Sequence, residues 1–180
     1  MNKKENKLDI CTCKRRDFTK LLLTGSFGLS FWLSSALSAK AEYKAKALVL
    51  SCIDFRFVDF ERNFLINSNL DHQFDWLSLA GASLALTDFP SPADTIVFWE
   101  QLALSYKLHN IEQVIILDHQ DCGAYSSKFN TNLTQNLEEE INIHRQYLTQ
   151  AYDAIANRYP NLTIELYFIY LDGKVEQIDV

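Results

Sequence analysis

The chain has 180 residues, of which 48% are hydrophobic, so it is long enough for one domain with a proper core. Residues 1–41 carry eight of the 17 Lys and Arg but only three of the 23 Asp and Glu, which leaves residues 42–180 with a formal charge of −11. A domain this acidic, without a basic run, repels nucleic acid phosphates, which excludes a nucleic-acid-binding protein and favours one that acts on small molecules.

The first 41 residues have the pattern of an export signal. Arg15-Arg16 forms a twin-arginine pattern, and the moderately apolar stretch Leu21–Leu37 leads to the small-x-small sequence Ala39-Lys40-Ala41. A retained membrane anchor is the alternative, but Gly and Ser interrupt the stretch, which makes it marginal for crossing ~30 Å of hydrocarbon. We therefore expect a cleaved twin-arginine signal over residues 1–41 and a periplasmic domain over residues 42–180.

Strand and helix patterns alternate along this domain. In chain order we expect a strand at 46–52, a helix at 57–67, a strand at 74–79, a helix from the N-cap Ser91 to about 108, a strand at 113–118, a helix at 134–159 and a strand at 162–170, followed by a turn at Asp172-Gly173 and a short tail. This alternation predicts a three-layer α/β fold with a mainly parallel central sheet of about four strands. Ligands of such sheets bind at the carboxyl ends of the strands.

Two of the predicted strands end in residues that ligate metals. Cys52 closes the first strand, and His119 and Cys122 follow the third. Two thiols and an imidazole make a three-ligand zinc site with an open fourth position, which is typical of a catalytic metal. Asp54 and Arg56, just after Cys52, supply charged groups beside it.

The cysteine count leaves a disulfide as the alternative. Cys11 and Cys13 lie in the predicted signal, so the exported domain keeps only Cys52 and Cys122, which could pair in an oxidising periplasm. A plain disulfide would not require His119 or the acid–base pair after Cys52, so we favour the metal. The twin-arginine system carries folded proteins, and zinc could therefore be loaded in the reducing cytoplasm.

These motifs resemble those of the β-class carbonic anhydrases, Cys-x-Asp-x-Arg followed by His-x-x-Cys-Gly. The chain has Cys52-Ile53-Asp54-Phe55-Arg56 and His119-Gln120-Asp121-Cys122-Gly123, and Ala80-Gly81 and Asp172-Gly173 also match the family. The resemblance covers nearly the whole domain. It implies a β-carbonic-anhydrase-like fold, a homodimer, and a zinc-dependent lyase that interconverts carbon dioxide and bicarbonate through a zinc-bound hydroxide.

The resemblance also implies a role for each motif residue. Cys52, His119 and Cys122 would ligate Zn2+. Asp54 would accept a hydrogen bond from the metal-bound water or, in a closed state, take the fourth position itself. Arg56 would pair with Asp54 and hold it off the metal.

Some residues depart from the family pattern. Ile53 and Phe55 stand where the family usually has small polar residues, and Ser78-Leu79 replaces its common Arg-Asn. Two alternatives therefore stay open: a zinc hydrolase of a carbon dioxide analogue (carbonyl sulfide or carbon disulfide), and a non-catalytic zinc-binding domain of the same fold. The remaining histidines are expected away from the metal, His72 and His109 at exposed or capping positions and His144 on a solvated helix face.

Overall fold

The structure is a computed structural model, and it describes residues 44–130 and 133–180; the predicted signal lies outside the described residues. The elements in chain order are β1 (Ala47–Ser51), α1 (Val58–Asn67), β2 (Phe74–Ser78), the 3-10 helix η1 (Ala82–Thr87), α2 (Pro92–His109), β3 (Gln113–His119), α3 (Gly123–Phe129), the 3-10 helix η2 (Leu133–Gln135), α4 (Leu137–Arg158), β4 (Thr163–Ile169) and β5 (Val175–Gln177). None of the helices in the described ranges is both long and apolar enough to cross a membrane.

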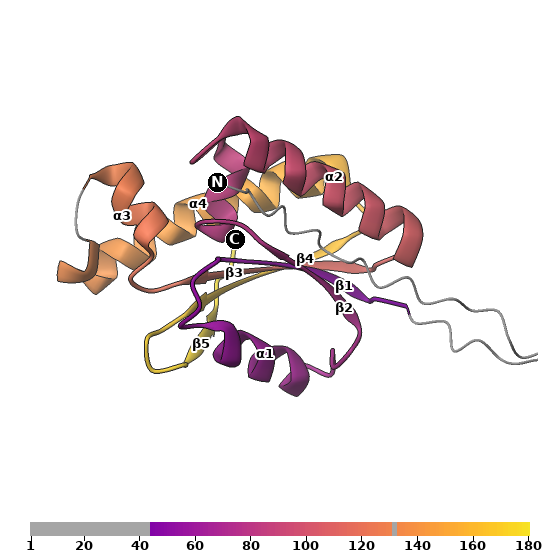
Figure 1. The fold of residues 1–180 in the computed structure, drawn as a ribbon, viewed down its shortest axis with the longest axis horizontal. Helices are drawn as coiled ribbons and strands as arrows, with labels where there is room; N and C mark the ends of the chain where they lie inside the picture. The colour runs from indigo at the N-terminus through magenta and orange to yellow at the C-terminus, as the bar shows by residue number, and fades with distance from the viewer. Residues whose placement is uncertain (1–43, 131–132) are drawn as a thin grey trace, which may run out of the picture. The chain divides into compact units, whose positions relative to one another are not determined.

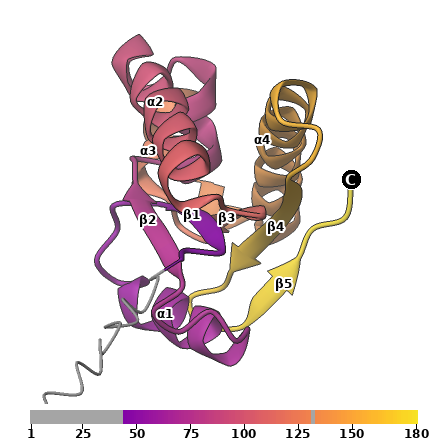
Figure 2. The same ribbon diagram turned by 90° about the vertical axis from the view of Figure 1, so that its right-hand side faces the viewer.

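The elements form three layers around one sheet with the strand order β2-β1-β3-β4-β5. The first four strands of this order run parallel, and β5 pairs antiparallel with β4. Helix α1 covers one face of the sheet, while α2 and α4 cover the other (Figures 1 and 2). The predicted α/β class is confirmed, but the sheet has one strand more than predicted, because the tail after the Asp172-Gly173 turn pairs with β4.

Each face of the sheet has its own apolar core. Alternate residues of one strand point to opposite faces, so Val49 of β1 packs toward α1 while Leu48 and Leu50 pack toward α2 and α4. All residues of β1 are buried, as expected for a central strand with helices on both sides. Because helices cover both faces, residues 47–50 are all apolar instead of alternating between apolar and polar.

Most predicted boundaries agree with the structure to within two residues, and the exception is α4. This helix begins at Leu137, three residues later than predicted, because the Asn136 side chain caps it by accepting a hydrogen bond from the Glu139 amide. The preceding residues form η2. Besides η2 and β5, the helices η1 and α3 were also not predicted; they have six and seven residues and are too short to show a clear apolar period.

The strand register brings the two predicted motifs to the same edge of the sheet. Ser51, the last residue of β1, pairs with Leu117 of β3 and with Ser78 of β2. Cys52 therefore leaves β1 where β3 approaches His119, its last residue. Residues far apart in sequence meet at the carboxyl ends of neighbouring parallel strands, as this class of sheet requires.

Candidate metal centre

Cys52, His119 and Cys122 converge at this edge of the sheet. Their ligand atoms all lie within 4.8 Å of one another, and all three side chains are buried. The two Sγ atoms are 3.9 Å apart, and both cysteines are free thiols. Cys52 follows β1, His119 ends β3, and Cys122 is the N-cap residue of α3. The structure thus brings together the three side chains that the sequence predicts as ligands.

The orientation of His119 suits a metal. Its Nδ1 donates a hydrogen bond to the Gln120 carbonyl oxygen at 2.8 Å, which leaves Nε2 as the atom with a free lone pair. Nε2 is buried and has no hydrogen-bond partner in the described part of the chain. The Phe57 ring lies over the imidazole at a centroid distance of 4.1 Å and helps to fix its plane. A buried unpartnered nitrogen beside two thiols is a donor set that fits Zn2+.

The two thiols have unequal acidities because they share a hydrogen bond. The pKa of Cys52 lies well below its ordinary value, chiefly because the Cys122 thiol donates to it, with added help from His119 and the Gly81 amide. The pKa of Cys122 is raised, because it gives that hydrogen bond to Cys52 and is itself buried. A metal ion binds both as thiolates, so uptake should release protons and weaken as the pH falls.

The Gly81 amide reaches the Cys52 sulfur because residue 81 has no side chain. Its N–H lies 3.3 Å from Sγ, and its φ of 78° is in the left-handed region. A Cβ at this position would lie 3.0 Å from Cβ of Leu84 and 3.1 Å from Cβ of Ala124. The Ala80-Gly81 turn after β2 therefore serves the site through its backbone.

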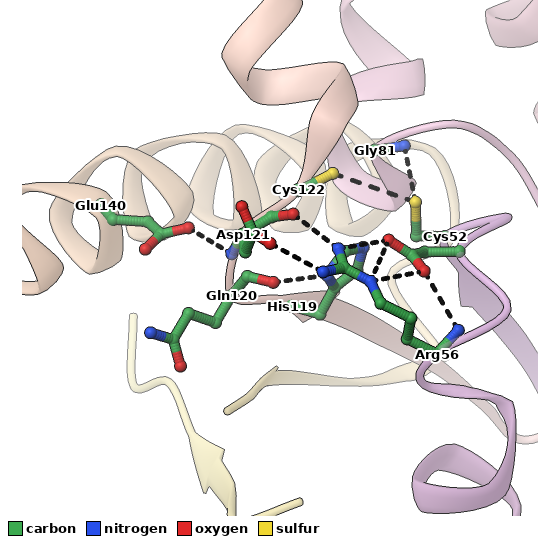
Figure 3. A network of polar contacts seen from close by, with 9 residues as sticks. Cys52, Arg56, Gly81, His119, Gln120, Asp121, Cys122 and Glu140 are labelled. Carbon is green, nitrogen blue, oxygen red and sulfur yellow. Dashed lines mark hydrogen bonds and ion pairs between the residues drawn. The ribbon is translucent and has the colours of Figure 1, made fainter. Parts of the chain in front are cut away.

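Asp54 and Arg56 form the ion pair that the sequence predicts. Arg56 Nη2 donates to Asp54 Oδ2 at 2.7 Å, and Nε lies 3.0 and 3.1 Å from the two carboxylate oxygens. These hydrogen bonds lower the pKa of Asp54, so the carboxylate stays ionised near neutrality. The free edge of the guanidinium binds Asp121, a contact that the sequence did not reveal (Figure 3).

A cavity of about 450 Å³ opens beside the site. Cys52 and Asp54 line it together with a mainly apolar set: Ile53, Phe55, Ala80, Phe89, Pro90, Gly123, Ala124 and Ser127. Ile53 and Phe55 are 65% and 85% exposed, so the two residues that depart from the family pattern lie at the protein surface beside the candidate ligand Cys52.

Behind the site lies a buried polar cluster around Asp118. The Asp118 carboxylate accepts hydrogen bonds from the Ser83 hydroxyl at 2.7 Å, Tyr125 at 2.9 Å and His144 Nδ1 at 2.8 Å. The expectation for His144 was wrong: its side chain is 1% exposed instead of solvated. It is buried because the inner face of α4, with Glu140, His144 and Leu148, packs against β3, the loop after it and the sheet core. His72 and His109 have side chains that are 81% and 42% exposed, as predicted.

Glu61 of α1 is a second titratable group that the sequence did not single out. It is 1% exposed, and neither carboxyl oxygen has a hydrogen-bond partner among the described residues. Burial raises the pKa of Glu61 from 4.5 to about 7. The folded state thus holds this proton more tightly than the unfolded chain, so its contribution to stability is complete below pH 4.5 and is lost as the pH rises to about 7.

We expect Glu61→Gln to remove this pH dependence. The free energy of unfolding of the variant, relative to the parent protein, should rise by ~2–3 kcal/mol between about pH 4.5 and pH 7.5 and then stay level. Urea unfolding of the reduced, metal-free protein measures it, because a bound cation would itself lower the pKa of the carboxyl. Glu138→Gln, at an exposed position of α4, is the control. A difference that does not change with pH would show that Glu61 is not the titrating group.

The protein has the β-carbonic anhydrase fold. It is an α/β protein with a mainly parallel sheet, and a Cys-His-Cys cluster and an Asp–Arg pair lie at the carboxyl ends of its strands. Solved structures share this fold. The β-carbonic anhydrase CafA of Aspergillus fumigatus matches with a TM-score of 0.52 at 13% identity, covering 75% of this chain and 76% of that chain. A tetrameric β-carbonic anhydrase of Sordaria macrospora matches with a TM-score of 0.53 at 11% identity, covering 76% and 81%.

Sequence comparison gives the family. The family model described as "Putative carbonic anhydrase" matches residues 42–179, and the chain therefore belongs to this carbonic anhydrase family. An uncharacterized protein of Rickettsia conorii is 35% identical over 140 residues, which cover 75% of this chain and 73% of that protein. An uncharacterized protein of Rickettsia bellii is 34% identical over 135 residues, covering 75% and 82%.

Proposed function

We propose that this protein is a zinc-dependent lyase that interconverts carbon dioxide and bicarbonate. The observation that carries the proposal is the buried cluster of Cys52, His119 and Cys122, with ligand atoms within 4.8 Å of one another, next to an ion-paired carboxylate. Zinc held by these three side chains would acidify a water molecule in its fourth position and so supply the nucleophile.

The protein side chains would orient that nucleophile. Asp54 lines the same cavity as Cys52, and its ionised carboxylate can accept a hydrogen bond from the attacking water. Arg56 holds the carboxylate through two nitrogens and would thereby keep it from becoming a metal ligand itself. The apolar residues around the cavity limit the number of competing water molecules, which suits a small uncharged substrate such as carbon dioxide.

Stopped-flow measurement of carbon dioxide hydration by the zinc-loaded protein tests the proposal. We expect turnover well above the uncatalysed rate, and we expect it to disappear when a chelator removes the metal and to return when zinc is restored. Protein that holds zinc but does not hydrate carbon dioxide would refute the proposal.

A second candidate function is hydrolysis of carbonyl sulfide or carbon disulfide. The exposed apolar side chains of Ile53 and Phe55 favour it, because an apolar cavity mouth suits an uncharged linear substrate, and these two side chains offer no polar contact to bicarbonate, the charged product of carbon dioxide hydration. Release of sulfide from carbonyl sulfide without carbon dioxide hydration would support this candidate. Turnover of neither substrate by zinc-loaded protein would indicate a non-catalytic zinc-binding domain.

We also propose that the domain forms a homodimer. Strand β2 is an edge strand of the sheet, and exposed apolar side chains of Val58, Ile66 and Trp76 line a groove of about 730 Å³ beside it. An uncovered strand edge next to an apolar groove is a surface that a second copy can cover. Solution scattering should give the mass of a dimer, and a monomer mass at every concentration would contradict the proposal.

A further inference from the structure

The Asp54–Arg56 pair is one end of a longer series of contacts. Arg56 Nη1 donates to Asp121 Oδ2 at 2.7 Å, and Nη2 donates to the Asp121 carbonyl oxygen at 2.9 Å. The Asp121 amide in turn donates to Glu140 Oε1 at 2.6 Å. Figure 3 shows Glu140, Asp121 and Arg56 in one row beside the two cysteines. The series joins helix α4 to both loops that carry the candidate ligands.

The backbone of Asp121 explains why the series needs Glu140. Asp121 has a φ of 58°, in the left-handed region that only a few residue types besides Gly adopt readily. Its amide points to the Glu140 carboxyl of α4 instead of a backbone carbonyl. The Glu140 contact thus stabilises the backbone conformation in which the Asp121 side chain reaches Arg56.

Burial of the Glu140 carboxyl lowers the stability of the fold, so a purely structural role does not explain this residue. It is fully buried, and Oε2 has no hydrogen-bond partner in the described ranges. A buried carboxyl oxygen without a partner lowers stability, and an apolar side chain of similar size would serve the core of α4 better. The benefit of Glu140 must therefore lie in what it holds.

We propose that Asp121 and Glu140 are positioning residues that fix the Arg56 guanidinium against Asp54. The proposal rests on the proposed function, because it assigns these residues to the control of the Asp54 carboxylate. Asp121 is the direct anchor of the guanidinium, and Glu140 anchors Asp121. Without them the contacts described for the Arg56 guanidinium would be those with Asp54 and with the Phe57 ring, whose centroid lies 5.6 Å from Cζ, so the pair could move as a unit toward or away from the metal site.

Substitutions of Asp121 test the direct anchor. Asp121→Gly suits the left-handed backbone but removes the carboxylate, whereas Asp121→Asn keeps an oxygen that can accept from Arg56 Nη1. NMR of the guanidinium nitrogen resonances in metal-free protein measures how fast the Arg56 side chain rotates about its Nε–Cζ bond. We expect this rotation rate to increase about tenfold in Asp121→Gly and clearly less in Asp121→Asn. Asp88→Gly is the matched control, because Asp88 has a φ of 60° and no place in the series.

Substitutions of Glu140 separate positioning from folding. Glu140→Leu should mobilise the Arg56 guanidinium, because it removes the acceptor of the Asp121 amide, and Glu140→Gln, which keeps an acceptor, should restore the parent behaviour. A merely structural role predicts lower stability with an unchanged Arg56 signal, so the Arg56 signal decides between the two, not the melting temperature. An unchanged signal in both Asp121→Gly and Glu140→Leu would overturn the proposal. The NMR measurement needs neither metal nor turnover, so it is independent of the activity assay. If the variants mobilise Arg56 but the zinc-loaded parent protein does not hydrate carbon dioxide, the proposed function is refuted and the positioning role of Asp121 and Glu140 stands.

Discussion

Cys52→Ser and Cys122→Ser should each lower the affinity for zinc by more than about tenfold, because a hydroxyl replaces a thiolate ligand. The loss should be severe, since the cluster in the described part of the chain has three ligand atoms, and each substitution would leave one thiolate and one imidazole. Zinc content measured after dialysis against a weak chelator should fall from about one ion per chain to a small fraction of that.

The chain offers matched controls for this experiment. Cys11→Ser and Cys13→Ser make the same chemical change in the predicted signal, and the uncleaved chain should keep its zinc. The metal assignment would fail if native metal-free protein contained a Cys52–Cys122 disulfide and took up no zinc after reduction. The Sγ–Sγ separation of 3.9 Å makes such a bond reachable with a small movement, so the reduction step is essential.

Arg56→Lys should keep zinc but lose at least about tenfold in activity near neutral pH. Arg56 now contacts Asp54 through two nitrogens and Asp121 through the other edge of the same planar group. An ammonium group cannot reproduce this geometry. Asp54 would then be the nearest competitor for the fourth position of a bound zinc, since it lies two residues from the proposed ligand Cys52.

Asp54→Asn distinguishes the restraint of the carboxylate by Arg56 from the orientation of the attacking water by Asp54. It should also keep zinc and lose activity, but for another reason, since an amide cannot orient the attacking water as a carboxylate does. Zinc X-ray absorption should show a carboxylate oxygen on the metal in Arg56→Lys and a water in Asp54→Asn. Full activity in Arg56→Lys, or lost activity with an unchanged metal shell, would show that Arg56 does not restrain Asp54.

The residues that we propose as ligands could be predicted from the sequence because of where they stand. Cys52 closes one mainly apolar run and His119 follows another, and such runs are buried parallel strands whose carboxyl ends meet at one edge of the sheet. Two local patterns were therefore enough to place distant residues together. The strand β5 was missed because its three residues gain their order from pairing with β4, which no local pattern reveals.

The residues around the ligands could not be predicted, because their burial depends on tertiary contacts. Glu140 and His144 are four residues apart on α4, which was a usable signal, but polar side chains on a helix usually face solvent. They are buried because Glu140 binds Asp121 in the loop after β3 and His144 binds Asp118 within β3. Asp121 carried no sequence signal for its contact with Arg56, since the contact depends on a left-handed backbone.

The central claim is that Cys52, His119 and Cys122 hold a zinc ion whose fourth position is open to water. Zinc X-ray absorption of the zinc-loaded parent protein tests it most directly. We predict two sulfur ligands at about 2.3 Å, one imidazole nitrogen at about 2.0–2.1 Å and one further light atom that a small anionic inhibitor displaces. A shell with three or more sulfur ligands, or without imidazole, would contradict the account.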